Sequence, residues 1–330
     1  MSYSIYNNSV FNSSITVFRN IERFNFTNRL SDEKKSELYH CLSEYILRID
    51  PCFKFIDLLT CSPVTKGVLY EKGQINREMF TACQGQIAVS DKNKSSFGIN
   101  IFDHLTIYSA SPVLDLKSRF YDVYQLEGEI GKTENFAANT KLGYLSPLVK
   151  ACGMGMFGEV RVFLPGLSTR DNFEELSKSY FRKGYELAKV NPVEGVVSSY
   201  FTIRTIFNYG VTEQSLIEGF EDGVRAIIDL DRDILTKKYN NQKLLMTDNI
   251  YRSYGILANA RLMKFDEAVS HLDNLRTGLI LGLDTGLDAD QLNRITGCIS
   301  QAHISDHIAS SGGSENCVRA DIIRAMISSF

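Results

Sequence analysis

Two histidines that could bind a metal ion, His303 and His307, lie four residues apart near the end of the sequence. On a helix this spacing places both rings on one face, as in zinc sites of the HExxH type. The rest of that motif is absent, so we interpret both histidines as surface or capping residues and expect no metal site. The cysteines lack CxxC spacing, which favours reduced thiols that pack as small apolar groups, at positions 41, 52, 61, 83, 152, 298 and 317.

A glycine-rich run at 153–158, GMGMFG, has the letters of a dinucleotide-binding GxGxxG motif. That motif works because its glycines open a helix whose N-terminus binds phosphate. Here the run leads into GEVRVFLP at 158–165, whose period of two predicts a strand, so we reject a dinucleotide site. The sequence contains neither a P-loop nor a GxSxG nucleophile motif. The residues alone therefore indicate no more than a soluble, cytosolic α+β protein.

The elements that would position a site change in character along the chain. Apolar residues recur at helical spacing over 31–50, between a Ser31 cap and Pro51, which predicts a helix. Short alternating runs then predict strands at 85–90, 98–101, 104–110, 158–165 and 196–207. Within the strand at 158–165, Glu159 and Arg161 share one face.

The last third of the sequence is predicted to be helical. Thr212 caps a long helix whose inward stripe consists of Leu216, Phe220, Val224, Ile227, Ile228 and Leu235. Further helices are predicted near 247–263, 265–282, 287–309 and 315–328. We therefore predict an α+β fold with an α/β domain at 1–240 and a helical domain at 241–330.

Charge and hydropathy exclude several classes of protein. The 330 residues carry a formal net charge of −3, and no basic cluster of the kind that binds nucleic acid is present. The N-terminus lacks the basic and apolar regions of a signal peptide. The longest apolar stretch, around 279–283, is far shorter than the roughly 20 residues of a membrane span. We expect a cytoplasmic protein that binds neither nucleic acid nor membranes.

Several blocks of the sequence resemble one known family. YRSYGILANAR at 251–261 is followed by LRTGLILGL at 275–283, and residues 142–167 carry GYL, GxG and LPGL. RNI at 19–21 and DHL at 103–105 match two further blocks. Together they resemble the bacterial protein-arginine kinases of the McsB family, relatives of the guanidino (phosphagen) kinases. The resemblance implies a phosphagen-kinase-like antiparallel sheet flanked by helices, followed by a C-terminal all-helical domain that dimerises and binds phosphoarginine.

The resemblance also locates the family's catalytic positions. In the family, arginines hold the phosphates of ATP, and a carboxylate orients the guanidinium and accepts its proton. Of the first motif only Arg19 survives here, and the last motif, RGxYGEG, should fall near 187–193, where neither its arginine nor its glutamate is present. The remaining positions carry uncharged residues, namely Ser14, Thr16, Ile101, Phe102, Thr106 and Phe157.

These replacements imply a pseudokinase, a protein without catalytic residues that keeps the fold of its family. The resemblance implies an interaction or regulatory role in bacterial protein-arginine phosphorylation or Clp proteolysis. It further implies a homodimer and, as partners, an McsA-like activator or a ClpC-like unfoldase. No cofactor is expected, and ATP and Mg²⁺ would be needed only by an active kinase.

A working kinase with a rebuilt site is one alternative. It would need a new set of cations in the cleft, for which the chain offers Arg19, Lys141, Lys150, Arg161 and Arg204. An ion pair with Glu159 explains Arg161 equally well.

A phosphoarginine reader is the other alternative. The family's RDxxRA element corresponds to 320–325 here, where Ala320 replaces the first arginine while Asp321 and Arg324 persist. An arginine can clamp phosphate and an aspartate can bind a guanidinium. The two residues lie three apart, so an ordinary ion pair on a helix face would also account for them.

Overall fold

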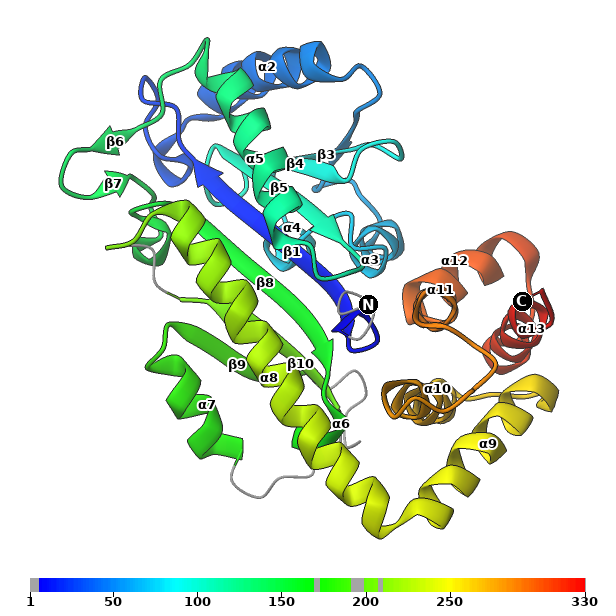
Figure 1. Ribbon diagram of the computed structural model, residues 1–330. Coiled ribbons are helices and arrows are strands. Elements are labelled where there is room, and N and C mark those ends of the chain that lie inside the picture. The colour runs from blue at the N-terminus through cyan, green and yellow to red at the C-terminus, as the bar shows by residue number, and fades with distance from the viewer. Residues whose placement is uncertain (1–5, 169–172, 191–198, 207–209, 330) are drawn as a thin grey trace.

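An antiparallel sheet of eight strands forms the centre of the larger domain in the computed structural model, within the described residues 6–168, 173–190, 199–206 and 210–329 (Figure 1). Its strands lie in the order β2-β3-β4-β5-β1-β8-β10-β9. This confirms the predicted fold class. The strands are β1 (Val10–Arg19), β2 (Lys54–Asp57), β3 (Gln86–Val89), β4 (Ser95–Ile99), β5 (Leu105–Ser111), β8 (Met156–Phe163), β9 (Tyr185–Val190) and β10 (Tyr200–Thr205).

Most predicted strands fall where their alternation placed them. The strand predicted at 98–101 is displaced, because β4 runs from Ser95 to Ile99 and the chain turns at Asn100. Asn100 has a φ of 56° and its N–H donates to the His104 carbonyl, which turns the chain into β5. Parts of the strand predicted at 196–207 lie outside the described residues. A separate small hairpin pairs β6 (Ala138–Asn139) with β7 (Gly143–Tyr144).

Helices α5 (Leu116–Gly131) and α8 (Glu213–Asn241) lie across one face of the sheet (Figure 1). The predicted cap of α8 is confirmed, because the Thr212 hydroxyl accepts a hydrogen bond from the Ser215 N–H. Its predicted stripe packs into the core, where Gly158 of β8 leaves room for the Phe220 ring. The other helices of this domain are α2 (Asp32–Ile49), α3 (Pro63–Glu71), α4 (Arg77–Thr81), α6 (Pro165–Ser168) and α7 (Phe173–Phe181).

From Asn12 onward, after a register shift in the pairing with β8, odd-numbered and even-numbered residues of β1 face opposite sides of the sheet. Ile15 and Val17 are buried in the core beneath α5 and α8. Because β1 and β8 pair directly, the neighbours of Ser14 and Thr16 on the other face are Glu159 and Phe157. The sheet therefore presents an apolar face to the helices and a mixed face of polar and aromatic side chains to a cleft.

Asp231 of α8 anchors α6 and is fully buried. Its Oδ1 accepts the Leu167 N–H at 2.7 Å, while its Oδ2 has no hydrogen-bond partner among the described residues. Burial raises the pKa of Asp231 to about 7, although the Leu167 and Gly166 amides oppose this. The folded state therefore favours the protonated form, and ionisation above the pKa destabilises it.

We expect Asp231→Asn to gain stability relative to the wild type as the pH rises from 5 to 8. The wild-type penalty is absent below the unfolded pKa of about 4 and complete above the folded pKa of about 7. The asparagine can still accept the Leu167 N–H through Oδ1, and it does not titrate. Urea unfolding at both pH values measures the difference. A difference between the two proteins that stays constant with pH would contradict this prediction.

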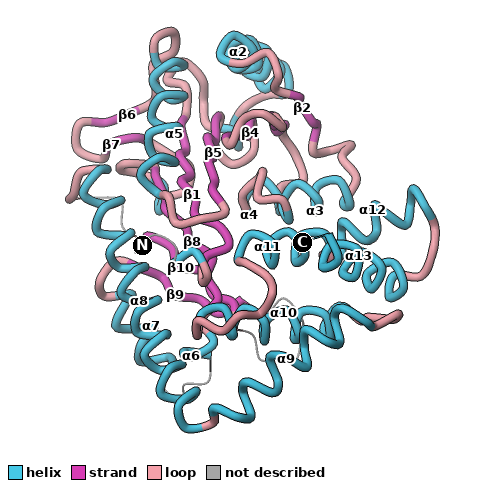
Figure 2. The backbone as a smooth tube through the Cα atoms, turned by 45° about the vertical axis from the view of Figure 1, so that its right-hand side comes forward, coloured by secondary structure: helices cyan, strands magenta, loops and turns pink. Residues whose placement is uncertain are grey.

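Five helices form the C-terminal domain (Figure 2). This domain has a hydrophobic core of its own, which includes Ile250, Leu272 and Ile295. The helix predicted at 287–309 is wrong in one respect, because it is broken at Ser300, whose backbone is extended. The family-like block at 275–283 covers the end of the helix Phe265–Ile280 (α10) and the start of the turn after it. The helices are α9 (Lys243–Asn259), α10 (Phe265–Ile280), α11 (Ala289–Cys298), α12 (Gln301–Ser311) and α13 (Glu315–Ser329).

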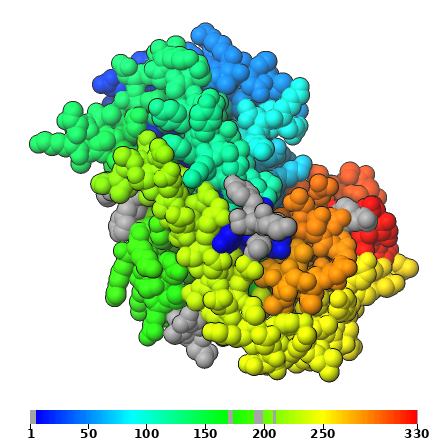
Figure 3. Space-filling model, viewed as in Figure 1, coloured from blue at the N-terminus to red at the C-terminus, as the bar shows by residue number. Residues whose placement is uncertain are grey.

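The two domains are in direct contact, and the space-filling view shows α10 and α11 against the larger domain (Figure 3). Glu71 at the end of α3 accepts hydrogen bonds from the Ala302 and His303 N–H groups at 3.0 and 3.2 Å. Its Oε2 also lies 2.6 Å from the His303 Nδ1. Glu71 thus caps α12 from the other domain. On the second contact, Tyr200 of β10 donates to Asp273 of α10 at 2.6 Å.

The described residues also bear on two classes of site. They contain no helix that is long and apolar enough to cross a membrane. Across the same ranges, no group of three or more His, Cys, Asp or Glu side chains is arranged to hold a metal ion.

Candidate functional site

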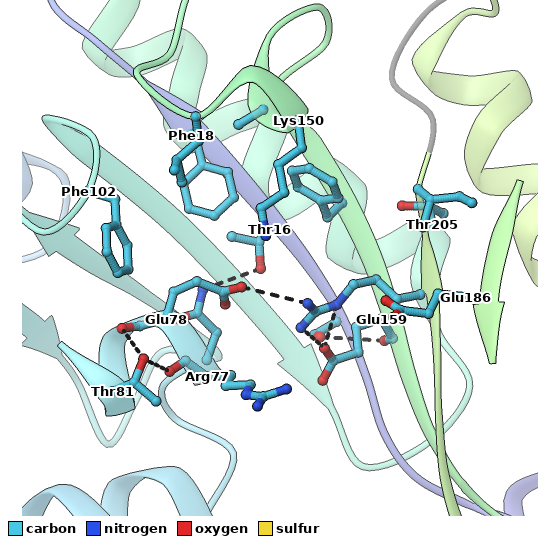
Figure 4. A pocket seen from close by; sticks show the side chains of 17 residues that line it. Thr16, Phe18, Arg77, Glu78, Thr81, Phe102, Lys150, Glu159, Glu186 and Thr205 are labelled. Carbon is cyan, nitrogen blue, oxygen red and sulfur yellow. Dashed lines mark hydrogen bonds and ion pairs between the residues drawn. The ribbon is translucent and has the colours of Figure 1, made fainter. Parts of the chain in front are cut away.

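A cavity of about 430 Å³ opens on the face of the sheet opposite α8 (Figure 4). Its floor comes from β1, β8 and β10, and its sides from α4 and from the segments around 102 and 148–151. Its volume is within the range of small-molecule sites. A second cavity of about 600 Å³ adjoins it, and both are lined by Arg77, Glu159, Glu186 and Arg204. The two cavities therefore form one cleft.

Four of the six replaced catalytic positions meet in the first cavity, namely Ser14, Thr16, Phe102 and Phe157. Ser14 and Thr16 lie two residues apart on β1 and therefore share the face that lines the cavity. Thr16 lies opposite Phe157 on β8. The sheet register therefore brings together residues that are far apart in the sequence.

The other two positions, Ile101 and Thr106, do not line the cavity. Ile101 is 5% exposed and packs in a small core beneath α4. Thr106 is 1% exposed and lies opposite Phe18 on β1. Among the three positions of this segment, only Phe102 points outward, with 42% of its surface exposed.

One end of the cavity is aromatic. The rings of Phe18 and Phe157 meet edge to face with their centroids 5.9 Å apart. Phe102 lies on the same side of the cavity as Phe18, and the Lys150 side chain extends past Phe18 toward Thr16 (Figure 4). This end is suited to apolar groups.

The other end of the cavity is charged but balanced. Glu159 Oε1 lies 3.1 Å from Arg161 Nε, and Glu159 Oε2 lies 3.0 Å from Arg204 Nε. Burial would raise the pKa of Glu159, but the two guanidinium groups outweigh it and lower that pKa. Arg204 also lies 3.8 Å from Glu78. Among the described residues lining the first cavity, three cations face three carboxylates, Arg77, Lys150 and Arg204 against Glu78, Glu159 and Glu186.

The basic residues considered for a rebuilt kinase site separate into two groups. Lys150 and Arg204 line the first cavity and Arg161 lines the second. Lys141 is exposed in the turn between β6 and β7. Arg19 lies on the opposite face of β1, where it is 1% exposed and donates to Glu127 at 2.5 Å. The predicted ion pair between Arg161 and Glu159 is present.

The family-like blocks that persist in the sequence hold the fold together. Asn20 of the RNI block donates to Asp103 of the DHL block at 2.6 Å and to the Leu145 carbonyl of the GYL block at 3.0 Å. The Ile21 N–H donates to His104 Nδ1 at 2.9 Å, and burial lowers the pKa of that histidine. Three retained blocks therefore meet in one buried network, whereas four of the replaced positions line the cavity.

Some residues of the cavity were not predicted from the sequence. Arg77 and Glu78 begin α4, whose cap Asn76 accepts the Met79 N–H at 2.8 Å. Phe18 and Glu186 also line the cavity. For Phe18 a signal exists, because it has the same parity along β1 as Ser14 and Thr16. For the α4 residues and Glu186, no motif in the sequence marks them.

The predicted position of the last family motif, 187–193, lies partly on β9. Leu187 is buried in the hydrophobic core and Lys189 lines the second cavity. Residues 191–193 lie outside the described part of the chain.

Asp321 and Arg324 form the ion pair that their spacing on α13 allows. Arg324 also donates to the Ala260 carbonyl at the end of α9. Arg319, one position before the replaced Ala320, is 1% exposed and donates to the Met263 carbonyl at 3.1 Å. Both arginines thus connect helices of the C-terminal domain, and phosphoarginine binding stays a prediction.

Comparison with known proteins agrees with this geometry. Residues 38–234 match the sequence model of the family described as ATP:guanido phosphotransferase, C-terminal catalytic domain. Residues 243–330 match the protein-arginine kinase McsB C-terminal domain. The chain is 25% identical over 324 residues to a protein-arginine kinase of Bacillus subtilis, covering 96% of this chain and 88% of that one. It is also 25% identical over 302 residues to a protein-arginine kinase of Caldanaerobacter subterraneus, covering 89% of each.

Solved structures share the fold. The substrate-free duplicated taurocyamine kinase of Schistosoma mansoni superposes with a TM-score of 0.60 at 20% identity, over 72% of this chain and 35% of that chain. A lombricine kinase superposes with a TM-score of 0.58 at 17% identity, over 68% of this chain and 66% of that chain. At this identity the likeness concerns the fold alone.

The eight-stranded sheet, its cleft and the match over 38–234 define a guanido phosphotransferase fold. The helical domain that follows matches the McsB C-terminal domain, which identifies one family within that class. The chain belongs to the McsB family of protein-arginine kinases.

Proposed function

We propose that this protein is a pseudokinase of its family, which does not transfer phosphoryl groups and acts by binding other proteins. The observation that carries the proposal is the lining of the first cavity. Ser14, Thr16, Phe102 and Phe157 stand there where the family resemblance places charged groups. The remaining cations of that lining are matched by carboxylates.

Phosphoryl transfer from ATP depends almost entirely on positioning and on neutralising the phosphate charge. Loss of a single donor to a developing anion typically slows a reaction by roughly 10²–10³-fold. Here the charged groups are absent at several positions at once. A phenyl ring at Phe157 supplies no charge, and the arginines nearby already bind Glu159. The first cavity therefore offers no excess positive charge to neutralise the phosphates of Mg²⁺-ATP, and we propose that no cofactor is used.

The test compares this protein with the Bacillus subtilis relative in a single assay. Each protein is incubated with labelled ATP, Mg²⁺ and an unfolded arginine-rich protein, and acid-labile phosphate on the substrate is measured. We expect label only with the relative. ATP titration by calorimetry, with and without Mg²⁺, should give no saturable heat for this protein. Time-dependent, acid-labile label that requires ATP would refute the proposal.

A surface on α9 supports the part of the proposal that concerns partners. Leu244, Leu245 and Tyr251 are 86%, 59% and 50% exposed, and exposed apolar side chains are what a protein–protein contact would cover. We propose a homodimer, and as further partners an McsA-like activator or a ClpC-like unfoldase in the cytoplasm. Light scattering after gel filtration measures the oligomeric state, and binding of each purified partner is measured by titration. A monomer that binds neither partner would contradict this part.

A further inference from the structure

Two arginines reach into the cleft from adjacent strands. Arg161 lies on β8 opposite Thr202 of β10, and Arg204 of β10 lies opposite Glu159 of β8. The side chains of Arg161 and Arg204 are 27% and 20% exposed. They are therefore within reach of a molecule that enters the cleft.

Both guanidinium groups bind the same carboxylate. Glu159 engages Arg161 through one oxygen and Arg204 through the other, with Nε to oxygen distances of 3.1 and 3.0 Å. Its side chain is 15% exposed and lies where the two cavities join. A carboxylate of the protein thus occupies the place between two arginines that an anionic ligand would take.

We propose that Arg161 and Arg204 form an anion-binding site that Glu159 keeps filled, and that a polyphosphate binds there once the Glu159 charge is removed. Paired guanidinium groups suit phosphate because their N–H donors match its oxygens. An anion on the same chain competes at a high effective concentration and excludes one in solution. The inference rests on one part of the proposed function, namely that the cleft of the wild-type protein binds no polyphosphate.

Other charged groups also face the junction, because Arg77 and Glu186 line both cavities and Glu186 lies opposite Arg204 on the neighbouring strand. Glu78 Oε1 lies 3.8 Å from Arg204 Nη1 and offsets part of the positive charge of that guanidinium group. The Tyr70 ring lies under Arg161, with the guanidinium carbon 4.6 Å from its centroid, and fixes the plane of that group. Because the aromatic stacking and the strand backbone hold Arg161 in place, removal of Glu159 should leave its donors pointing into the cleft.

The experiment titrates inorganic tripolyphosphate into three proteins by calorimetry at low ionic strength. Glu159→Gln removes the carboxylate charge and keeps the size of the side chain. Glu186→Gln is the matched control, because Glu186 is exposed and lines the same cavities with the same charge. We expect Glu159→Gln to bind tripolyphosphate at least tenfold more tightly than the wild type or Glu186→Gln. Adding Arg204→Gln to Glu159→Gln should abolish the gain.

Three outcomes would overturn the inference. Wild-type protein could bind tripolyphosphate as tightly as Glu159→Gln, the two glutamine variants could gain equally, or the gain could survive the loss of Arg204. If Glu159→Gln does not fold, Glu159→Ser offers a smaller polar replacement, and the rise of its melting temperature with tripolyphosphate gives the same comparison. The kinase assay on wild-type protein tests the proposed function separately, because no step of this titration transfers a phosphoryl group.

Discussion

Replacing Arg276 by alanine should lower the free energy of unfolding by roughly 2–6 kcal/mol, which is about 1–3 kcal/mol for each of two acceptors that lose their donor. Arg276 of α10 is 2% exposed. It donates to the Asn8 carbonyl at 3.2 Å and to Asn293 Oδ1 at 2.6 Å. Its guanidinium carbon lies 4.3 Å from the centroid of the Phe11 ring. One side chain thus joins α10 and α11 to the start of β1.

The loss is expected to be large because alanine leaves the acceptors at the junction of the two domains without their donors. Urea unfolding followed by circular dichroism measures it. Arg252→Ala is the matched control, since Arg252 is 73% exposed and pairs with Asp248 at 3.5 Å on the surface of α9. That control should lose only about 0.2–1 kcal/mol. Equal losses in the two variants would contradict the role assigned to Arg276.

The second large effect is expected at Arg19, where alanine should also cost about 3–5 kcal/mol of unfolding free energy. Arg19 donates to Glu127 and to the Met154 carbonyl at 2.5 and 2.9 Å. Its guanidinium carbon lies 3.6 Å from the centroid of the Tyr144 ring. Removing it leaves the Glu127 carboxylate, whose side chain is 13% exposed, without its partner.

Arg19→Lys distinguishes charge from geometry at this site. Lysine keeps the positive charge but lacks the planar fork that bonds a carboxylate and a carbonyl together, so we expect it to restore only part of the stability. Because Arg19 faces away from the cleft, neither variant should change tripolyphosphate binding when introduced into Glu159→Gln. A stable Arg19→Ala variant with altered binding in the cleft would show that Arg19 belongs to the cleft.

The strand alternation in the sequence predicted part of the site correctly. Val160 and Val162 are buried toward α8, while Glu159 and Arg161 share the other face and form an ion pair. This succeeds because a strand has a side-chain period of two that does not depend on its neighbours. The long helix after Thr212 was predictable for a similar reason, since its cap and its apolar stripe are both local signals.

Other parts of the site depend on long-range contacts that no local pattern contains. Glu78 approaches Arg204 from α4, which is distant from β10 in the sequence. The break between α11 and α12 coincides with the cap that Glu71 supplies from the other domain. Such contacts arise only when separate elements pack, and the local apolar pattern at 287–309 therefore predicts one continuous helix.

By itself, the sequence determined the family of this protein, its antiparallel sheet and helical domain, and the uncharged residues at the family's catalytic positions. Only the tertiary structure decided which charged residues face the cleft. Arg19 turns away from it, whereas Arg161 and Arg204 enter it and bind Glu159. The physical reason is the register in which the strands of the sheet pair. A charge has its effect through the groups within a few ångströms of it, and the pairing of β1, β8 and β10 chooses those groups from across the chain.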